Sequence, residues 1–271
     1  MSDILTAVLL GIVEGVTEFL PVSSTGHLIL ATKLLGYDAE RWALFNVVIQ
    51  LGAIAAVVVL YWRTFWTVLN GLLRGEAGAF RFVRNIVLAF LPAAVIGLAL
   101  HKRIEALLGN ATAVAVALII GGIAILLVER FARPGSVEGV GNVPLPTAAG
   151  IGLVQCLAMF PGVSRSGATI LGGVALGVER RTAAEFSFFL AIPTMLGASV
   201  LELISKRHAL SAGAGGSGVG AAAMAVGLLV SFLVALLVVR GFVNFVSRHG
   251  FSPFAWYRIV AGLLALTLLS R

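Results

Sequence analysis

The chain of 271 residues is 59% hydrophobic and only 11% charged, and its mean hydropathy of +1.05 lies far above that of soluble domains. This composition excludes a soluble globular protein and indicates an integral membrane protein. The net charge of +7 comes from basic residues scattered through short connecting segments, so it indicates helix orientation and contact with anionic lipids, and no nucleic acid as a partner.

The first segment in chain order, residues 11–30, is apolar but is interrupted by Glu14, Glu18, Pro21 and a run of hydroxyl groups. The first 12 residues lack a basic n-region, so we expect insertion without a cleaved signal peptide. Pro21 and an SSTGH turn break the helix, so we expect the segment to enter the membrane and turn back. Irregular backbone at that depth must be buried in protein or line a wet cavity.

Three apolar runs follow, and the second half repeats the arrangement after an interrupted segment at 152–171, which contains Pro161, Gly162 and an SRSG turn. Each run is near the ~20 residues that a hydrocarbon core requires. We therefore predict six crossing helices, at 43–62, 85–101, 111–129, 186–204, 220–239 and 254–270. Residues 133–146 are predicted to link the halves, and residues 211–220 to form a flexible loop.

A shift of 141 positions aligns residues 11–30 with 152–171 without gaps, and eight of the twenty positions are identical. We predict a single membrane domain, residues 1–271, built from repeats at about 1–130 and about 147–271. The predicted fold class is an all-α integral membrane protein with an inverted-topology repeat, each half being a re-entrant helical hairpin plus three transmembrane helices. The two hairpin tips should meet near the midplane around a polar chamber.

On this topology the loops 63–84, 130–185 and 240–253 share one side and hold ten Lys and Arg residues, against seven on the other side. The positive-inside rule makes the first side cytoplasmic and directs both termini outward. This count omits Arg165 and Arg258, which we expect inside the membrane. Arg258 has no evident partner in the sequence, and we expect its side chain to reach toward the interface.

Glu14 and Glu18 are four residues apart and share one helical face. Each charged carboxylate in lipid costs roughly 2.5–3.5 kcal/mol, so something must compensate the pair. One interpretation is a divalent cation, Mg²⁺ or Ca²⁺, which accepts one or two protein carboxylates and completes its shell with water and phosphate oxygens. The alternative is a structural pair that is protonated or bonded to neighbouring backbone.

Arg165 lies in the second interrupted segment, and its planar guanidinium suits phosphate oxygens. A structural alternative is that it neutralises Glu14 or Glu18. An anion site is favoured by the hydroxyl residues and glycines of both tips, which can form a nest of N–H groups, namely Ser23, Ser24, Thr25, Gly26, Ser164, Ser166, Gly167 and Thr169.

His27 is the one histidine inside an apolar segment. A lone buried histidine is usually structural, but beside two acids and an arginine it becomes a candidate general acid or base. Asn46 and Gln50 share a helical face; they could extend the chamber, although a hydrogen bond between helices is the more usual role.

The segments EGVTEFLPVSSTGH (14–27) and PGVSRSGATI (161–170) closely resemble the two signature segments of bacterial undecaprenyl-diphosphate phosphatases, a membrane family linked to bacitracin resistance. The likeness extends over essentially the whole chain. It implies hydrolysis of undecaprenyl diphosphate, a polyprenyl diphosphate lipid, to undecaprenyl phosphate in the bacterial inner membrane, which recycles the lipid carrier of cell-wall synthesis. By this resemblance the family's acidic, hydroxyl, histidine and phosphate-clamping positions fall on Glu14, Glu18, Ser24, His27, Ser164, Arg165, Ser166 and Thr169.

We expect a metal-assisted phosphatase whose chamber opens to the periplasm, with the cation on Glu14 and Glu18. Arg165 holds the diphosphate, Ser24 attacks phosphorus or positions a water, and His27 carries the proton. The alternative is a secondary transporter or lipid flippase that uses the same charged midplane site. A structural scaffold does not explain polar groups at matching offsets in both halves. The sequence leaves the oligomeric state open, including a homodimer.

Overall fold

The computed structural model describes residues 2–107, 110–205 and 218–269, and every regular element in these ranges is a helix. In chain order they are α1 (Asp3–Thr17), α2 (Ser24–Leu35), α3 (Ala39–Leu60), α4 (Trp62–Leu73), α5 (Ala77–Leu107), α6 (Ala111–Phe131), η1 (Val140–Asn142), α7 (Leu145–Gln155), η2 (Cys156–Met159), α8 (Arg165–Ala175), α9 (Arg180–Ser205), α11 (Ala221–His249) and α12 (Ser252–Leu269). The predicted all-α class is confirmed. Most of the predicted loop at 211–220 lies outside the described residues.

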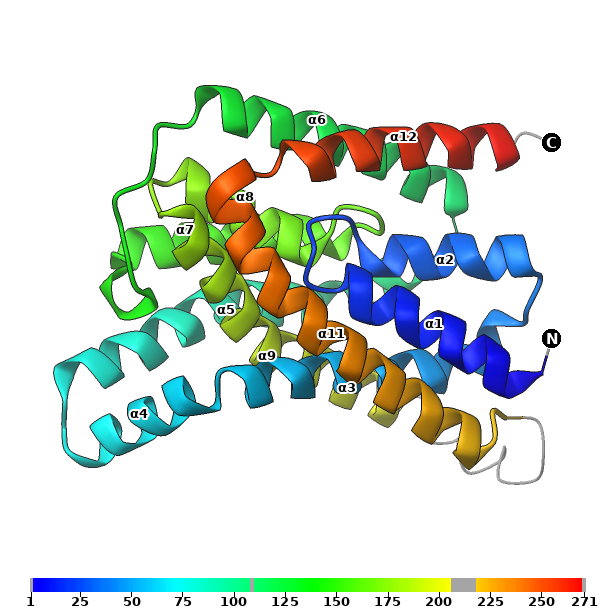
Figure 1. Cartoon of the computed structure of the whole chain (residues 1–271), viewed down its shortest axis with the longest axis horizontal. Helices are drawn as coiled ribbons and strands as arrows, with labels where there is room; N and C mark the ends of the chain where they lie inside the picture. The colour runs from blue at the N-terminus through cyan, green and yellow to red at the C-terminus, as the bar shows by residue number, and fades with distance from the viewer. Residues whose placement is uncertain (1, 108–109, 206–217, 270–271) are drawn as a thin grey trace.

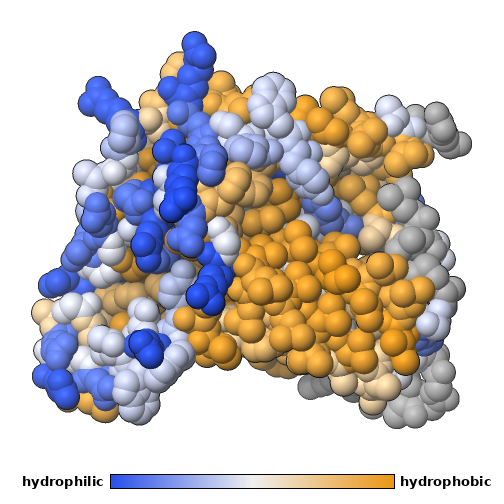
Figure 2. Space-filling model, in the orientation of Figure 1, coloured by the Kyte–Doolittle hydropathy of each residue, from blue (hydrophilic) through white to orange (hydrophobic). Residues whose placement is uncertain are grey.

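Six of the described helices are long and apolar enough to cross a membrane, as predicted: Arg41–Leu60, Ala77–Leu100, Ala111–Phe131, Arg180–Glu202, Ala221–His249 and Ser252–Leu269. Several extend beyond the predicted apolar runs, because helical hydrogen bonding continues through polar residues outside the hydrocarbon region. Hydrophilic side chains gather at the end of the molecule away from both termini, and apolar side chains cover much of the rest of this face (Figures 1 and 2). The chain is a multi-pass membrane protein.

Helix α4 was not predicted, because it lies in the segment 63–84 that was expected to be a loop. It is too short to cross a bilayer, but its large apolar residues recur at helical spacing and are exposed, at Trp62, Trp66, Leu69 and Leu73. Such a one-sided short helix is typical of a segment that lies in the membrane interface. Its 12 residues do not form an apolar run of crossing length, so the sequence does not indicate it.

The two interrupted segments form helical hairpins, α1 with α2 and α7 with α8. In Figure 1 the α1–α2 hairpin lies beside the N-terminus, whereas α7 lies toward the opposite end of the molecule. The predicted SSTGH and SRSG turns are wrong in extent: the helices restart at Ser24 and Arg165, inside those motifs. They restart there because the preceding serines, Ser23 and Ser164, cap the new helices.

These two cap residues share an unusual conformation. Ser23 and Ser164 have φ of 74° and 80°, and they are the only non-glycine residues with positive φ among those described. The Ser23 hydroxyl accepts from Gly26 N–H at 3.2 Å, and the Ser164 hydroxyl accepts from Gly167 N–H at 3.0 Å. The sequence repeat is therefore matched by a repeated backbone conformation at each tip.

Close helix packing depends on glycines where α1 and α3 cross α11. A Cβ added to Gly15 would lie 2.7 Å from Ser231 O, and one added to Gly52 would lie 2.5 Å from Leu228 O. The Ser231 hydroxyl reinforces this crossing by donating to Ile49 O at 2.7 Å. Small residues of this kind let helices approach closely in membranes.

Gly52→Ala is expected to lower the unfolding temperature in detergent, because overpacking of this kind costs about 1–3 kcal/mol. Gly241→Ala is the matched control in α11, since a Cβ there meets nothing within 4 Å. That control should be neutral or slightly stabilising, because alanine favours the helix more than glycine does. Equal unfolding temperatures for the two variants would contradict the packing argument.

Candidate active site

The tips of the two hairpins touch inside the molecule. The Ser166 hydroxyl donates to Leu20 O at 2.7 Å, which joins the start of α8 to the first break. Beside this contact is a cavity of about 200 Å³, lined by both tips together with residues of α3 and α9. Its polar lining includes Glu18, Ser23, Ser24, Thr25, Gln50, Ser164 and Arg165. Gln50 thus extends the chamber, and its Oε1 also accepts from the Ser199 hydroxyl of α9 at 3.5 Å, so it has both of the roles expected for it.

Three of the predicted site residues contact one another at this cavity. Arg165 Nη2 donates to Glu18 Oε1 at 2.9 Å, and these side chains are only 12% and 6% exposed. The Ser24 hydroxyl donates to the other oxygen, Glu18 Oε2. Glu18 therefore accepts from a hydroxyl and a guanidinium at the same time, and its pairing with Arg165 agrees with the neutralising role considered above.

The rest of the Arg165 guanidinium is held by the second half of the chain. Nη1 donates to Ser187 O at 2.9 Å, Nη2 lies 3.2 Å from Met195 Sδ, and the guanidinium carbon lies 5.8 Å from the centre of the Phe19 ring. Its Nε has no partner among the described residues. Arg165 is thus fixed in place with one donor to spare.

Ser166 and Thr169 do not line the cavity, although they were predicted to bind substrate. Both are 1% exposed, and the Thr169 hydroxyl lies 2.7 Å from Ser187 Oγ. Ser187 also accepts from Arg165, so Thr169 supports Arg165 indirectly. In this structure the two hydroxyls brace α8 and do not face the space available to a ligand.

His27 is also outside the cavity. Its Nδ1 lies 2.7 Å from Ser23 O and its Nε2 lies 2.7 Å from the Tyr257 hydroxyl, with the two rings stacked. Both ring nitrogens are therefore engaged away from Ser24. The structure brings Ser24 to Glu18, and does not bring it to the predicted proton carrier.

His27→Gln and Tyr257→Phe are expected to keep measurable hydrolytic activity and to lower it to a similar extent. The reason is that His27 orients the start of α2 through Ser23 and Tyr257. The rate of phosphate release from the purified variants checks this. Complete inactivity of His27→Gln beside a fully active Tyr257→Phe would restore His27 as the proton carrier.

Glu14 lies one helical turn from Glu18 and is 1% exposed, and its Oε1 has no hydrogen-bond partner. In the described residues no group of three or more Asp, Glu, His or Cys side chains forms a metal cage. Glu14 does not line the cavity between the tips, whereas Glu18 lines it with both carboxylate oxygens accepting hydrogen bonds. The unpartnered Glu14 oxygen is a carboxylate oxygen that could serve as a cation ligand. Gln155, its repeat equivalent, is also buried, with an unpartnered Nε2.

The prediction that Arg258 reaches toward the interface is wrong. Its side chain is 1% exposed and donates to backbone carbonyls at both hairpin tips and on α6. No sequence pattern signals these partners, because carbonyl groups belong to every residue. Arg258 is the main residue at the site that sequence reasoning missed.

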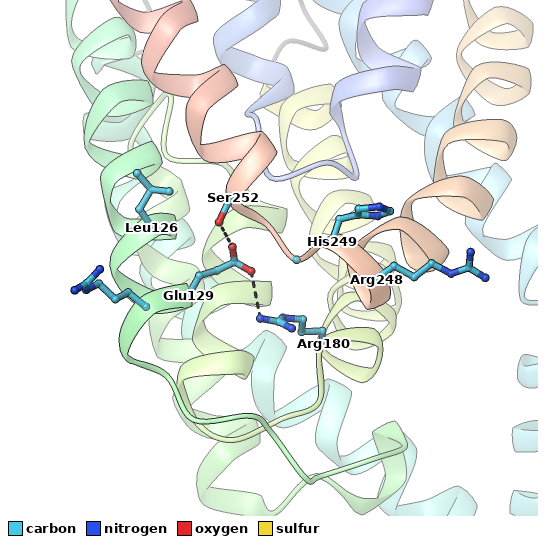
Figure 3. A pocket seen from close by; sticks show the side chains of 8 residues that line it. Leu126, Glu129, Arg180, Arg248, His249 and Ser252 are labelled. Carbon is cyan, nitrogen blue, oxygen red and sulfur yellow. Dashed lines mark hydrogen bonds and ion pairs between the residues drawn. The ribbon is translucent and has the colours of Figure 1, made fainter.

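A second cavity, of about 360 Å³, lies where α6, α9, α11 and α12 end or begin. Glu129 is at its centre and accepts from Phe251 N–H at 2.7 Å and from the Ser252 hydroxyl, and it lies 3.5 Å from Arg180 (Figure 3). Arg248 points away from Glu129 in Figure 3. This carboxylate ties helix ends together and is separate from the site between the tips.

The fold and the site define a multi-pass membrane enzyme, in which a hydroxyl, a carboxylate and a guanidinium meet at a cavity between two helical hairpins. Residues 7–264 match the family described as Bacitracin resistance protein BacA, and the chain belongs to that family. It is 65% identical to an undecaprenyl-diphosphatase of Novosphingobium aromaticivorans over 266 residues, 98% of each chain. It is 58% identical to the undecaprenyl-diphosphatase of Rhizorhabdus wittichii, over 99% of each chain.

Proposed function

We propose that this chain hydrolyses undecaprenyl diphosphate to undecaprenyl phosphate and inorganic phosphate in the cavity between the hairpin tips. The observation that carries the proposal is the contact of Ser24 and Arg165 with the two oxygens of Glu18. The three side chains provide a nucleophile in Ser24, a proton acceptor in Glu18 and a phosphate-binding guanidinium in Arg165. The names and full-length alignment of the relatives support the choice of substrate. The recycled lipid phosphate supports cell-wall synthesis, and the family name links this activity to bacitracin resistance.

Two helix N-termini favour the binding of the diphosphate. Both α2 and α8 begin at the cavity, so their free N–H groups and the positive ends of their dipoles attract an anion. Arg165, which lines the cavity, adds a full positive charge. The terminal phosphate is therefore bound beside Ser24.

Glu18 accepts the proton of Ser24 in the mechanism that we propose. Ser24 Oγ attacks the terminal phosphorus, the Oγ–P bond forms, and the bond from phosphorus to the bridging oxygen breaks, so undecaprenyl phosphate leaves. Water then hydrolyses the phosphoserine, which releases inorganic phosphate and returns the proton to Ser24. Arg165 stabilises charge on the phosphoryl oxygens throughout.

We also propose that the site binds a divalent cation, Mg²⁺ or Ca²⁺, and that Glu14 is its main protein ligand, beside Glu18. The unpartnered, buried Glu14 Oε1 supports this assignment. When bound, such a cation would neutralise negative charge on the diphosphate.

The proposed topology has the two halves inverted relative to each other, with the α1–α2 hairpin entering from the periplasm and α7–α8 from the cytoplasm of the bacterial inner membrane. The 141-residue repeat and the matching caps at Ser23 and Ser164 support a duplication. Three candidate crossing helices in each half support the inversion, because an odd number of crossings places the second half in the opposite orientation. The excess of basic residues on the side away from the termini supports the orientation. The polyprenyl tail then lies between crossing helices and lipid.

Phosphate release by protein purified in detergent tests this function, since no gradient exists there to reveal transport. Activity is expected with undecaprenyl diphosphate, to fall on addition of a chelator, and to return with Mg²⁺ or Ca²⁺. Glu14→Gln should need more cation for half-maximal activity than wild type does. Full activity in excess chelator would contradict the proposed requirement for a divalent cation. No phosphate release at all would contradict the proposed hydrolytic activity.

A further inference from the structure

The guanidinium of Arg258 uses all five of its N–H donors on backbone carbonyls. Nε donates to Leu118 O at 3.2 Å, Nη1 to Pro21 O and Val163 O at 3.0 Å each, and Nη2 to Ala117 O at 3.1 Å and Gly162 O at 2.8 Å. These acceptors come from the first hairpin tip, the second hairpin tip and α6. One side chain of α12 thus connects both broken segments to a crossing helix.

The charge of Arg258 is held without a carboxylate partner within the described part of the chain. A buried, unpaired charge is costly unless its hydrogen bonds are satisfied, and here carbonyl dipoles supply that compensation. A neutral side chain would fill the same space between helices at lower cost. The arrangement therefore calls for a role beyond packing.

That role follows from the planarity of the peptide bond. In a trans peptide the C=O and N–H groups point in opposite directions, so a carbonyl turned toward Arg258 turns the next N–H away from it. The N–H groups of Val22 and Val163 donate to Leu20 O and Phe160 O, at 2.8 and 3.2 Å. The Ser164 N–H, which follows the Val163 carbonyl, has no acceptor among the described residues, and Ser164 lines the cavity.

We propose that Arg258 is a positioning residue that holds the Val163–Ser164 peptide so that the Ser164 N–H donates to the substrate diphosphate. The same bonds fix the break that precedes Arg165, and the bond to Pro21 fixes the break that precedes Ser24. Arg258 thereby sets the distance between the two phosphate-binding helix starts without touching the substrate. This inference rests on the proposed function.

The space for this guanidinium comes from Gly121 on α6. A Cβ at Gly121 would lie 2.0 Å from Arg258 Nη2, so alanine there displaces the guanidinium and keeps its charge. Gly262 provides a matched control in the same α6–α12 contact. A Cβ at Gly262 would lie 2.6 Å from Ile119 Cγ1 and 2.7 Å from Ala115 O, away from the Arg258 side chain.

Binding of inorganic pyrophosphate to the purified full chain tests the inference, together with kcat, KM and the unfolding temperature. Arg258→Met and Gly121→Ala should bind pyrophosphate about tenfold or more weakly, the loss expected when a hydrogen bond to a charged group is misplaced. Arg258→Lys, which keeps the charge and three donors, should recover part of the affinity. Gly262→Ala should lose stability but bind pyrophosphate as wild type does.

A purely structural role would lower the unfolding temperature and leave the affinity of the folded protein unchanged. Wild-type pyrophosphate affinity in folded Arg258→Lys and Gly121→Ala would overturn the proposal, even if Arg258→Met does not fold. An unchanged affinity in these variants beside an active wild type refutes only the positioning role. A wild type that binds pyrophosphate but never releases phosphate refutes only the proposed function.

Discussion

Arg165→Ala is expected to reduce phosphate release from undecaprenyl diphosphate by about 10³-fold or more, the scale seen when a preorganised charge is removed from a phosphoryl-transfer site. Two effects add in this variant. The diphosphate loses its cationic partner, and Glu18, 6% exposed, loses the guanidinium that compensates its charge. Both kcat and kcat/KM should fall, because the interaction strengthens as charge develops on the leaving phosphate.

Two variants separate the chemistry of Arg165 from the stability of the fold. Arg165→Lys keeps a positive charge but cannot reach Glu18 and Ser187 together, so its activity should lie between those of alanine and wild type. Arg181→Ala removes a surface arginine, 62% exposed and paired with Glu185, and should leave the rate unchanged. Wild-type activity in folded Arg165→Ala would refute phosphate binding by this residue.

Ser24→Ala and Glu18→Gln are the other two variants for which we expect a large loss of activity. Ser24→Ala removes the nucleophile and should reduce turnover by about 10³-fold or more. Glu18→Gln keeps the shape of the side chain but removes the proton acceptor and the partner of Arg165, so it should be as inactive. The double variant should be no worse than either single one, because the two residues act as a unit.

Ser231→Ala is the control for loss of a buried hydroxyl, since Ser231 donates to Ile49 O at the α3–α11 crossing and should affect only stability. When wild type reacts with substrate labelled on the terminal phosphate and the reaction is rapidly quenched, labelled phosphoserine should be trapped on the protein. Ser24→Ala should not form it. Substantial phosphate release by Ser24→Ala would favour an activated water in its place. Glu18→Gln should then still be inactive, because the water also needs a proton acceptor.

Much of the fold could be predicted from the sequence because the bilayer leaves few alternatives for an apolar run of crossing length. The approach of the two tips also followed from the repeat, although Glu18 and Arg165 are 147 positions apart. Serine caps were harder to place, because Ser23 and Ser24 are adjacent and either could end the break. Positive φ at Ser23 and Ser164 decides where the helices restart, and no composition rule signals it.

The misplaced residues share a physical cause. Arg258 binds carbonyl groups, which carry no sequence signature, and the partner of His27 is Tyr257, 230 positions away. Thr169 occupies a motif position but points to Ser187 and braces α8, so a motif indicated the region and not the direction of each side chain. Helix α4 was missed because an interfacial helix needs only a one-sided apolar pattern.

The cavity between the tips, about 200 Å³, falls below the roughly 300–1,000 Å³ typical of small-molecule pockets. A cavity of this size suits a phosphate headgroup better than a whole polyprenyl diphosphate. We therefore expect the isoprenoid chain to remain in the bilayer while the headgroup is bound, so the rate should depend on the mole fraction of the substrate among the surrounding lipids. Diluting the substrate with inert phospholipid should slow the reaction even when its amount per volume of sample is held constant.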